Sequence, residues 1–261
     1  MTSIERLLEI MDRLRDPESG CPWDRGQSFA TIVPHTLEEA YEVADVIESG
    51  RYDALAGELG DLLFQIVFYA RMAKERGWFD FESVVEAICE KLVARHPHVF
   101  AGAPVGDAGE QTQQWEAIKA RERRAGNAAA GTLDGIALSL PAVSRAAKLQ
   151  RRAAQVGFDW PEAGPVFDKV LEELGEVRDS LAQGTERRAA EVGDLLFACV
   201  NLARHLDVDP EQALRGANAR FERRFVHIER SLAGQGKAIA EATAAEMEAL
   251  WEEAKRGDGG H

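Results

Sequence analysis

An internal duplication constrains the fold of this chain more than any other feature of its sequence. Residues 37–45 (LEEAYEVAD) match residues 171–179 (LEELGEVRD) at six of nine positions, and residues 58–64 (ELGDLLF) match residues 191–197 (EVGDLLF) at six of seven. Both order and spacing persist, which is typical of tandem repeats. The expected organisation is a first domain over 1–124, a linker over 125–135, a second domain over 136–256 and a tail over 257–261.

Apolar residues recur at helical spacing almost throughout the chain. In the first half this pattern predicts helices over 3–15, 37–49, 52–76, 81–95 and 110–124, with Thr36 as the N-cap of the second helix and a loop over 101–109. Strand signals are almost absent. The expected fold class is all-α, with two tandem copies of one helical bundle.

The composition narrows the classes of protein to consider. Hydrophobic residues make up 45% of the 261 residues, which is enough for a core, and the formal net charge of −14 argues against binding to a nucleic-acid duplex. No run of 18 apolar residues exists, so a membrane span is not expected. Three isolated cysteines (Cys21, Cys89 and Cys199) fit a reducing cytoplasm.

Each copy carries the same constellation of carboxylates on two successive helices. The first helix holds Glu-Glu-x-x-Glu and the second holds Glu-x-x-Asp, and each spacing gathers its side chains on one helix face. These residues are Glu38, Glu39, Glu42, Glu58 and Asp61 in the first copy, and Glu172, Glu173, Glu176, Glu191 and Asp194 in the second. A glycine inside each second motif, Gly60 or Gly193, fits close approach of the opposite helix or of the substrate, or a simply tolerated packing glycine.

Four carboxylates beside an apolar segment are costly unless something neutralises them. Shared protons or a divalent cation would do so, whereas a lone acidic helix face is usually just solvated. Ligation by oxygen alone suits Mg²⁺, or Mn²⁺ as a substitute. A di-iron bundle would need Glu-x-x-His pairs, which neither copy has. No P-loop motif is present either, so a P-loop NTPase is excluded.

Several motifs resemble the MazG family of nucleoside triphosphate pyrophosphohydrolases. In the first half these are GCPWDRGQSFATIVPHTLEEAYEVADVI, GELGDLLFQIVFYA and RHPHVF; in the second half they are VGFDW, KVLEELGEV, EVGDLLFACVNLARHL and ANARFERRF. The resemblance covers residues 1–256. It implies an all-α fold, a homodimer, and Mg²⁺-dependent hydrolysis of NTPs and dNTPs to the monophosphate and pyrophosphate.

The resemblance also implies roles for particular residues. In the second copy, the metal ligands and catalytic groups would be Glu173, Glu176, Glu191 and Asp194; in the first copy, the matching ligands would be Glu39, Glu42, Glu58 and Asp61. The nucleotide would be bound by Lys169, Glu172, Asp194, Arg220, Phe221, Glu222, Arg223, Arg224 and Trp251. Trp251 fits two interpretations, stacking on the base or anchoring the C-terminal helix.

The first copy departs from this pattern in its basic residues. His35 stands where the second copy has Lys169, and RHPHVF replaces the FERRF segment. The second copy is therefore expected to carry most of the turnover. Two other functions stay open: a narrower, house-cleaning dNTP pyrophosphatase, and a regulatory interaction protein that uses the duplicated helices as a docking surface.

Overall fold

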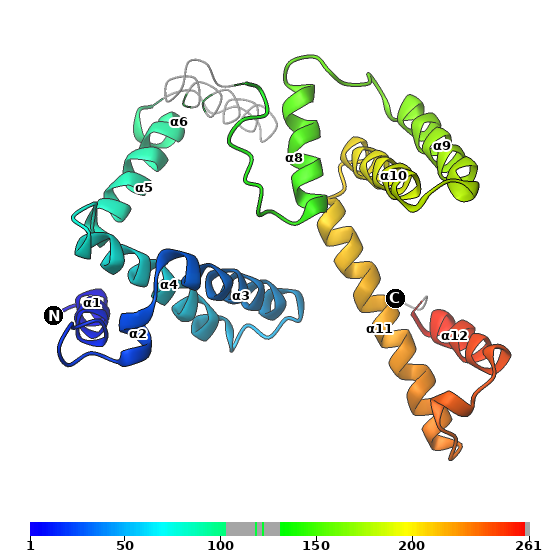
Figure 1. The fold of residues 1–261 in the computed structure, drawn as a ribbon, viewed down its shortest axis with the longest axis horizontal. Coiled ribbons are helices and arrows are strands. Elements are labelled where there is room, and N and C mark those ends of the chain that lie inside the picture. Colours follow the sequence, from blue (N-terminus) through cyan, green and yellow to red (C-terminus); the bar gives the residue numbers. More distant parts are fainter. Residues whose placement is uncertain (103–117, 119–121, 123–130, 259–261) are drawn as a thin grey trace. The chain divides into compact units, whose positions relative to one another are not determined.

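The computed structural model describes residues 1–102, 118, 122 and 131–258. The chain divides into two compact units, Met1–Ala120 (unit 1) and Arg121–His261 (unit 2). The described residues form helices and turns with no strand among them, so the predicted all-α class is confirmed (Figure 1). Apart from residues 118 and 122, which are helical, the expected helix over 110–124 lies outside the described residues, as do most of the expected loop over 101–109 and of the linker over 125–135. The domain boundaries stay a prediction.

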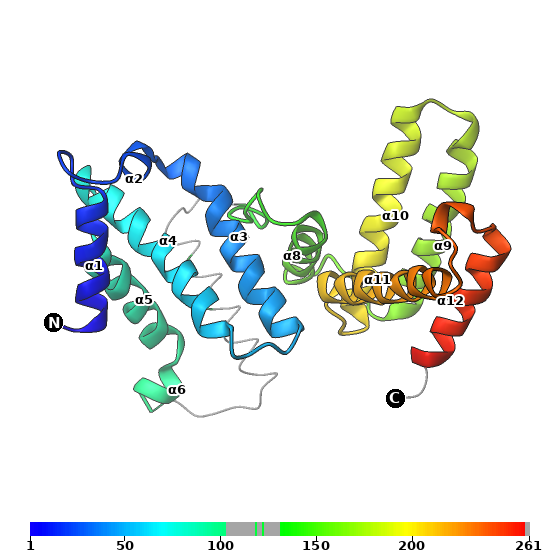
Figure 2. The ribbon, with the colours of Figure 1, turned by 90° about the horizontal axis from the view of Figure 1, so that it is seen from below.

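Unit 1 is organised around a helical hairpin. Its described helices are α1 (Ser3–Leu14), α2 (Pro22–Gly26), α3 (Phe29–Glu48), α4 (Leu55–Glu75), α5 (Phe81–Arg95) and α6 (Pro97–Phe100). The long helices α3 and α4 pack on each other, and α1 packs on α4 (Figure 2). The helices predicted over 3–15, 52–76 and 81–95 thus correspond to α1, α4 and α5.

The predicted start of the second helix is wrong. Helix α3 begins at Phe29, where the Ser28 side chain accepts a hydrogen bond from the Thr31 N–H and the Thr31 hydroxyl accepts one from the Ser28 N–H. Thr36 lies inside the helix, and its hydroxyl donates to the Ile32 carbonyl at 3.1 Å. Thr36 resembles a cap in sequence, but the reciprocal cap at Ser28 satisfies the N-terminal donors two turns earlier.

The core of unit 1 is centred on Phe68, which is completely buried. The buried residues in contact with it are Met11, Ile32, Val67 and Met72. The Arg15 guanidinium lies 5.3 Å from the centre of the Phe68 ring and forms an ion pair with Glu75 at 2.7 Å. Helix α1 is therefore held against α4 by apolar burial and by a largely buried charge pair.

Unit 2 is built around a second hairpin. Its described elements are α8 (Ala142–Ala154), α9 (Ala163–Asp179), the short helix η1 (Ser180–Ala182), α10 (Thr185–His205), α11 (Pro210–Gly234), η2 (Ile239–Glu241) and α12 (Ala244–Asp258). Helices α9 and α10 form the hairpin, α8 packs on α10, and α11 packs mainly on α12. None of the described helices in either unit is both long and apolar enough to cross a membrane.

In each unit, an arginine near the end of the hairpin's second helix forms an ion pair with an aspartate that lies earlier in the chain. In unit 2, Arg204 on α10 bonds Asp159, which lies between α8 and α9, and His205 also lies 3.0 Å from that carboxylate. In unit 1, Arg71 on α4 bonds Asp12 on α1 at 2.6 Å. Arg204 lies 133 residues after Arg71, so the spacing of the sequence repeats relates the two arginines, whereas their aspartate partners lie on different segments.

Candidate metal centre

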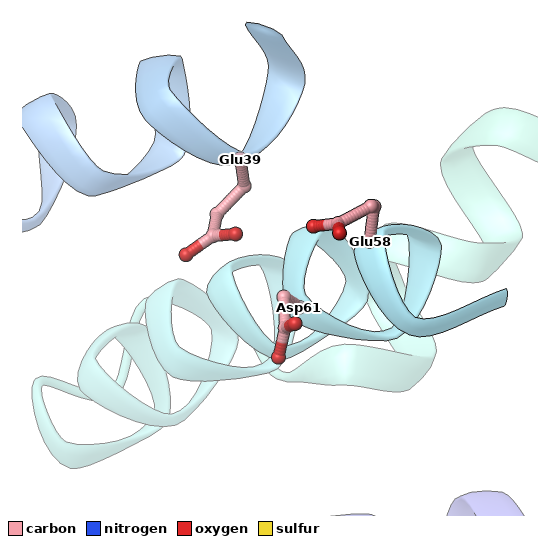
Figure 3. A group of neighbouring side chains, drawn as sticks. All are labelled: Glu39, Glu58 and Asp61. Carbon is pink, nitrogen blue, oxygen red and sulfur yellow. The ribbon is translucent and has the colours of Figure 1, made fainter. Parts of the chain in front are cut away.

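In unit 1, the α3/α4 hairpin brings three carboxylates together. Glu39 projects from α3 toward Glu58 and Asp61, which lie one turn apart on α4 (Figure 3). One oxygen of each lies within 4.8 Å of the others, and this is one of two such groups of possible metal ligands among the described residues. The i,i+3 spacing on α4 places its two carboxylates on the face that α3 covers.

In unit 2, the α9/α10 hairpin makes the equivalent group from Glu173, Glu191 and Asp194, again within 4.8 Å of one another. Glu173 and Glu191 are only 6% and 3% exposed, whereas Glu39 and Glu58 of unit 1 are half-buried. The predicted pairing of the two motifs is therefore present in both units, and it is more deeply buried in unit 2.

The third glutamate of each Glu-Glu-x-x-Glu motif lies beside its group but outside it. Glu42 and Glu176 are exposed. Burial and the neighbouring Asp61 and Glu42 carboxylates raise the pKa of Glu39. Desolvation and the carboxylates of Glu173 and Glu191 similarly raise the pKa of Glu176.

Basic side chains flank the carboxylates of unit 2. Lys169 Nζ lies 2.8 Å from Glu172 Oε1 and 2.7 Å from Glu173 Oε1, and these two carboxylates raise the pKa of the lysine. Arg187 forms an ion pair with Glu191. Lys169 therefore lies at the site as its sequence position suggested, and Glu172 contacts the cation rather than joining the carboxylate group.

Sequence reasoning missed Arg187, although a signal was available. Arg187 precedes Glu191 by four residues, a spacing that places the two side chains on neighbouring turns of one helix face. In unit 1 the residue 133 positions earlier is Ala54, which offers no charge. His35 there lies 3.7 Å from Glu38, which is outside the carboxylate group.

The residues of unit 2 fit a hard divalent cation. The donors are all carboxylate oxygens, which Mg²⁺ and Mn²⁺ prefer. Glu173 Oε2 is buried and has no hydrogen-bond partner within the described part of the chain. A buried carboxylate oxygen without a partner is costly, and a cation beside it would remove that cost.

The basic segment of α11 lies elsewhere in unit 2. Arg220, Phe221, Glu222 and Arg223 are exposed along α11, and Figure 1 shows this helix running away from the α9/α10 hairpin. Trp251 on α12 packs 5.4 Å from the Phe221 ring, and the Arg224 guanidinium lies 5.5 Å from the Trp251 ring. Trp251 therefore does anchor α12 on α11, and its role toward a nucleotide stays a prediction.

The glycines within the Glu-x-x-Asp motifs do not mark close packing inside the chain. A Cβ atom added at Gly60 or Gly193 would meet no described atom within 4 Å. Close approach of the opposite helix is therefore wrong, whereas close approach of the substrate stays a prediction.

Fold and site together define an all-α protein in which duplicated helical hairpins each present a group of carboxylates suited to a divalent cation. Residues 27–100 match the model of the MazG nucleotide pyrophosphohydrolase domain. The chain is 53% identical to the nucleoside triphosphate pyrophosphohydrolase of Escherichia coli K12, with 98% of each chain covered. It belongs to the MazG family.

Two further relatives show how far the similarity extends. The nucleoside triphosphate pyrophosphohydrolase/pyrophosphatase MazG of Thermotoga maritima is 42% identical over 97% of this chain and 96% of its own length. The Bacillus subtilis protein YabN is 39% identical over 94% of this chain, which corresponds to half of that longer protein. The similarity therefore spans both units, although the domain model matches within the first.

Proposed function

We propose that this protein is a Mg²⁺-dependent nucleoside triphosphate pyrophosphohydrolase. It converts an NTP or dNTP and water into the monophosphate and pyrophosphate. Full-length similarity to proteins named for this activity supports the reaction. The single structural observation that carries the proposal is the buried carboxylate group of Glu173, Glu191 and Asp194 with Lys169 beside it.

The cation would be held in unit 2 by Glu173, Glu176, Glu191 and Asp194. Glu39, Glu42, Glu58 and Asp61 form a second candidate set in unit 1. When bound, Mg²⁺ supplies Lewis acidity at the phosphate under attack and activates the attacking water. The carboxylates would orient the cation, and their negative charge would be balanced by its positive charge.

Lys169 and Arg187 supply the charge that a polyanionic substrate needs. In the absence of substrate each pairs with a carboxylate of the group. With a cation held by those carboxylates, Lys169 and Arg187 would be able to bond phosphate oxygens and to stabilise the negative charge on the departing pyrophosphate. Glu172, already bonded to Lys169 at 2.8 Å, orients the lysine on the nucleotide side.

The α11 residues reach the substrate from a second copy of the chain in this proposal. Arg220, Arg223 and Arg224, with Phe221 and Glu222, lie apart from the carboxylate group of their own α9/α10 hairpin. A homodimer is supported by the apolar side chains that the hairpins expose: Leu59, Ile66, Leu196 and Phe197 are 48%, 40%, 61% and 44% exposed. Apolar surface of this kind on paired helices favours self-association.

Release of pyrophosphate from each NTP and dNTP, with and without Mg²⁺, tests the function. ATP should give AMP and pyrophosphate in equal amounts, and activity should vanish in EDTA. ADP with inorganic phosphate would place the attack at the γ-phosphorus and refute the proposed reaction. Strong preference for one dNTP would identify the narrower, house-cleaning enzyme. No turnover of any nucleotide, with partner binding intact after loss of the carboxylates, would favour the regulatory protein.

A further inference from the structure

Unit 1 buries a polar side chain whose oxygen has no partner. Gln65 on α4 is only 6% exposed, and its Oε1 is buried without a hydrogen-bond partner among the described residues. A buried acceptor left without a donor or a cation is costly, and most buried polar atoms in folded proteins are therefore paired. The oxygen of Gln65 thus marks a point at which the described chain leaves a favourable contact unmade.

Gln65 lies beside the carboxylate group of unit 1. It follows Asp61 by four residues on α4, and this spacing places the two side chains on neighbouring turns of one helix face. Side chains on an α-helix point back toward its N-terminus, over the preceding turn, so the amide of Gln65 points toward Asp61. Asp61 is exposed and Gln65 is buried, so this face of α4 leads from the carboxylate group toward the core.

The polar groups on the other side of Gln65 already have partners. Tyr69 follows one turn later on α4, and its hydroxyl lies 2.9 Å from the hydroxyl of Thr36 on α3. Thr36 donates its only hydroxyl proton to the Ile32 carbonyl at 3.1 Å, so the Tyr69 hydroxyl is the donor to Thr36. The carboxylate side is therefore the side on which the oxygen of Gln65 can gain a partner.

A cation is the partner that this oxygen and the carboxylates have in common. Glu39, Glu58 and Asp61 form no ion pair with any basic side chain that the structure describes. A hydrogen-bond donor would satisfy Gln65 alone, whereas a divalent cation would satisfy the amide oxygen and neutralise the carboxylates together. Amide and carboxylate oxygens are both ligands that hard divalent cations accept.

Unit 2 differs at the matching positions. The residue 133 positions after Gln65 is Ala198, and the residue 133 positions after Phe68 is Asn201. Ala198 and Asn201 line a cavity of about 450 Å³ beside the carboxylate group of unit 2, whereas Gln65 and Phe68 are buried side chains of unit 1. Unit 2 has only a methyl group at the position of Gln65, so the additional oxygen is particular to unit 1.

We propose that Gln65 is a ligand of a divalent cation in unit 1, where its amide oxygen joins Glu39, Glu58 and Asp61. Mg²⁺ takes an octahedral set of oxygen ligands, so each protein oxygen leaves one position fewer for a phosphate. The cation of unit 1 is therefore held by the chain itself and needs no nucleotide. The inference rests on the cation binding in the proposed function, but not on turnover.

Three substitutions test this role in the absence of nucleotide. Gln65→Leu removes the amide oxygen at nearly constant size, and Gln65→Glu keeps an oxygen at that point. Gln150→Leu is the matched control, because Gln150 of unit 2 is also buried and its Oε1 also lacks a partner within the described chain. All three are made in Asp194→Ala, the parent protein, in which the carboxylate group of unit 2 has lost a member.

Two measurements are made on each protein. Mn²⁺ binding is followed through the electron paramagnetic resonance signal of the free ion, and melting temperature is followed by circular dichroism in EDTA and in Mg²⁺. We expect Gln65→Leu to bind Mn²⁺ about tenfold more weakly than the parent. Gln65→Glu should bind at least as tightly as the parent, and the control should match it.

The melting temperatures distinguish a ligand from a residue that only supports the fold. In EDTA, Gln65→Leu should melt at or above the parent, because it removes a buried acceptor that lacks a partner. Its rise in melting temperature on addition of Mg²⁺ should be smaller than that of the parent. Equal Mn²⁺ binding by Gln65→Leu and the control would overturn the proposal, and so would a parent that binds no Mn²⁺. If Gln65→Leu does not fold, Gln65→Ala, which introduces the residue of unit 2, replaces it.

The same proteins separate this inference from the proposed function. If the wild type releases pyrophosphate while Gln65→Leu and the control bind Mn²⁺ equally, only the role of Gln65 is refuted. If the wild type turns over no nucleotide, the proposed function fails. Mn²⁺ binding by the Asp194→Ala proteins then still decides the role of Gln65, because that measurement needs neither a nucleotide nor an intact site in unit 2.

Discussion

The two hairpins differ less in their carboxylates than in what surrounds them. Both gather a glutamate from one helix and a Glu/Asp pair from the next within 4.8 Å. Among the residues that the structure describes, only those of unit 2 place a lysine and an arginine in direct contact with that group, through Lys169 and Arg187. From this difference we expect that a carboxylate hairpin alone is enough for a cation, whereas a polyanionic substrate needs further positive charge.

The hairpins also use their interiors differently. Arg71 and Arg204 occupy matching positions, and each bonds an aspartate of an earlier segment in its own unit. At the position between these arginines and the carboxylates, unit 1 buries Phe68 completely, and unit 2 places Asn201 on the wall of a cavity. Unit 1 therefore fills this space with a core side chain, and unit 2 leaves it as a cavity.

The largest effect should come from emptying the unit 1 core. Phe68→Ala removes a completely buried ring and should destabilise unit 1 by about 3–5 kcal/mol. Asn201→Ala in unit 2 should cost about 1 kcal/mol, because it loses mainly one hydrogen bond. Urea denaturation followed by circular dichroism measures both. Equal costs would show that the two positions are not used differently.

Loss of one carboxylate should affect activity very unequally in the two units. Asp194→Ala should lower kcat for pyrophosphate release on the order of 10²–10³-fold, because the cation loses a ligand where the substrate reacts. Asp61→Ala should keep most of the activity. Both are assayed at saturating ATP and Mg²⁺. The reverse pattern would make unit 1 the enzyme, and equal losses would indicate two working or coupled sites.

Metal removal should lower thermal stability. Mg²⁺ at about 100 times its dissociation constant stabilises the folded state by about 2.7 kcal/mol for one site. Melting temperature is compared in EDTA and in Mg²⁺ for the wild type, Glu191→Gln and Glu58→Gln. Because Glu191 is almost completely buried, its variant should lose more of the Mg²⁺-dependent shift than the Glu58 variant. An equal melting temperature in EDTA and in Mg²⁺ would contradict cation binding.

Replacing Lys169, the lysine beside the carboxylate group, should make the site of unit 2 resemble that of unit 1. Lys169→His introduces the residue that unit 1 has at its matching position, His35. We expect about a tenfold loss in kcat/KM, or about 1.4 kcal/mol, with Mg²⁺ affinity retained. Lys148→His on α8, which is outside the site, serves as the control. Full activity in Lys169→His would contradict the proposal that the charge of Lys169 makes the two units different.

The smallest effect concerns the pH dependence of the metal-free protein. The pKa values of Glu39 and Glu176 are raised in the folded state, so each contributes stability below the unfolded value that is lost as pH rises through the folded value. In EDTA near pH 7, Glu39→Gln and Glu176→Gln should therefore melt above the wild type. The difference should disappear near pH 4.5. A constant difference across this range would mean that protonation is not its cause.

The carboxylate hairpins were predictable because every ligand lies within a short stretch of sequence. The i,i+3 and i,i+4 spacings fix which side chains share a helix face, and two adjacent helices leave few ways to pair those faces. The start of α3 was not predicted correctly, since Ser28 and Thr36 carry similar capping chemistry and only the packed helix distinguishes them.

Features that depend on distant contacts could not be read from the sequence. Phe68 and Asn201 occupy matching positions, but one becomes core and the other lines a cavity because of the α1 and α8 side chains packed near them. Likewise, nothing local to the ANARFERRF segment indicates that α11 leaves the hairpin and packs on α12. Tertiary packing decides both outcomes.

Each ligand set is contained in one contiguous hairpin, and this has an evolutionary consequence. A single copying event that spans roughly forty codons transfers the complete carboxylate group, because no member of the group comes from a distant part of the chain. The new copy starts with all of its carboxylates and can diverge at neighbouring positions such as 35 and 68. Gene duplication followed by divergence can thus produce two different sites in this architecture with few mutations.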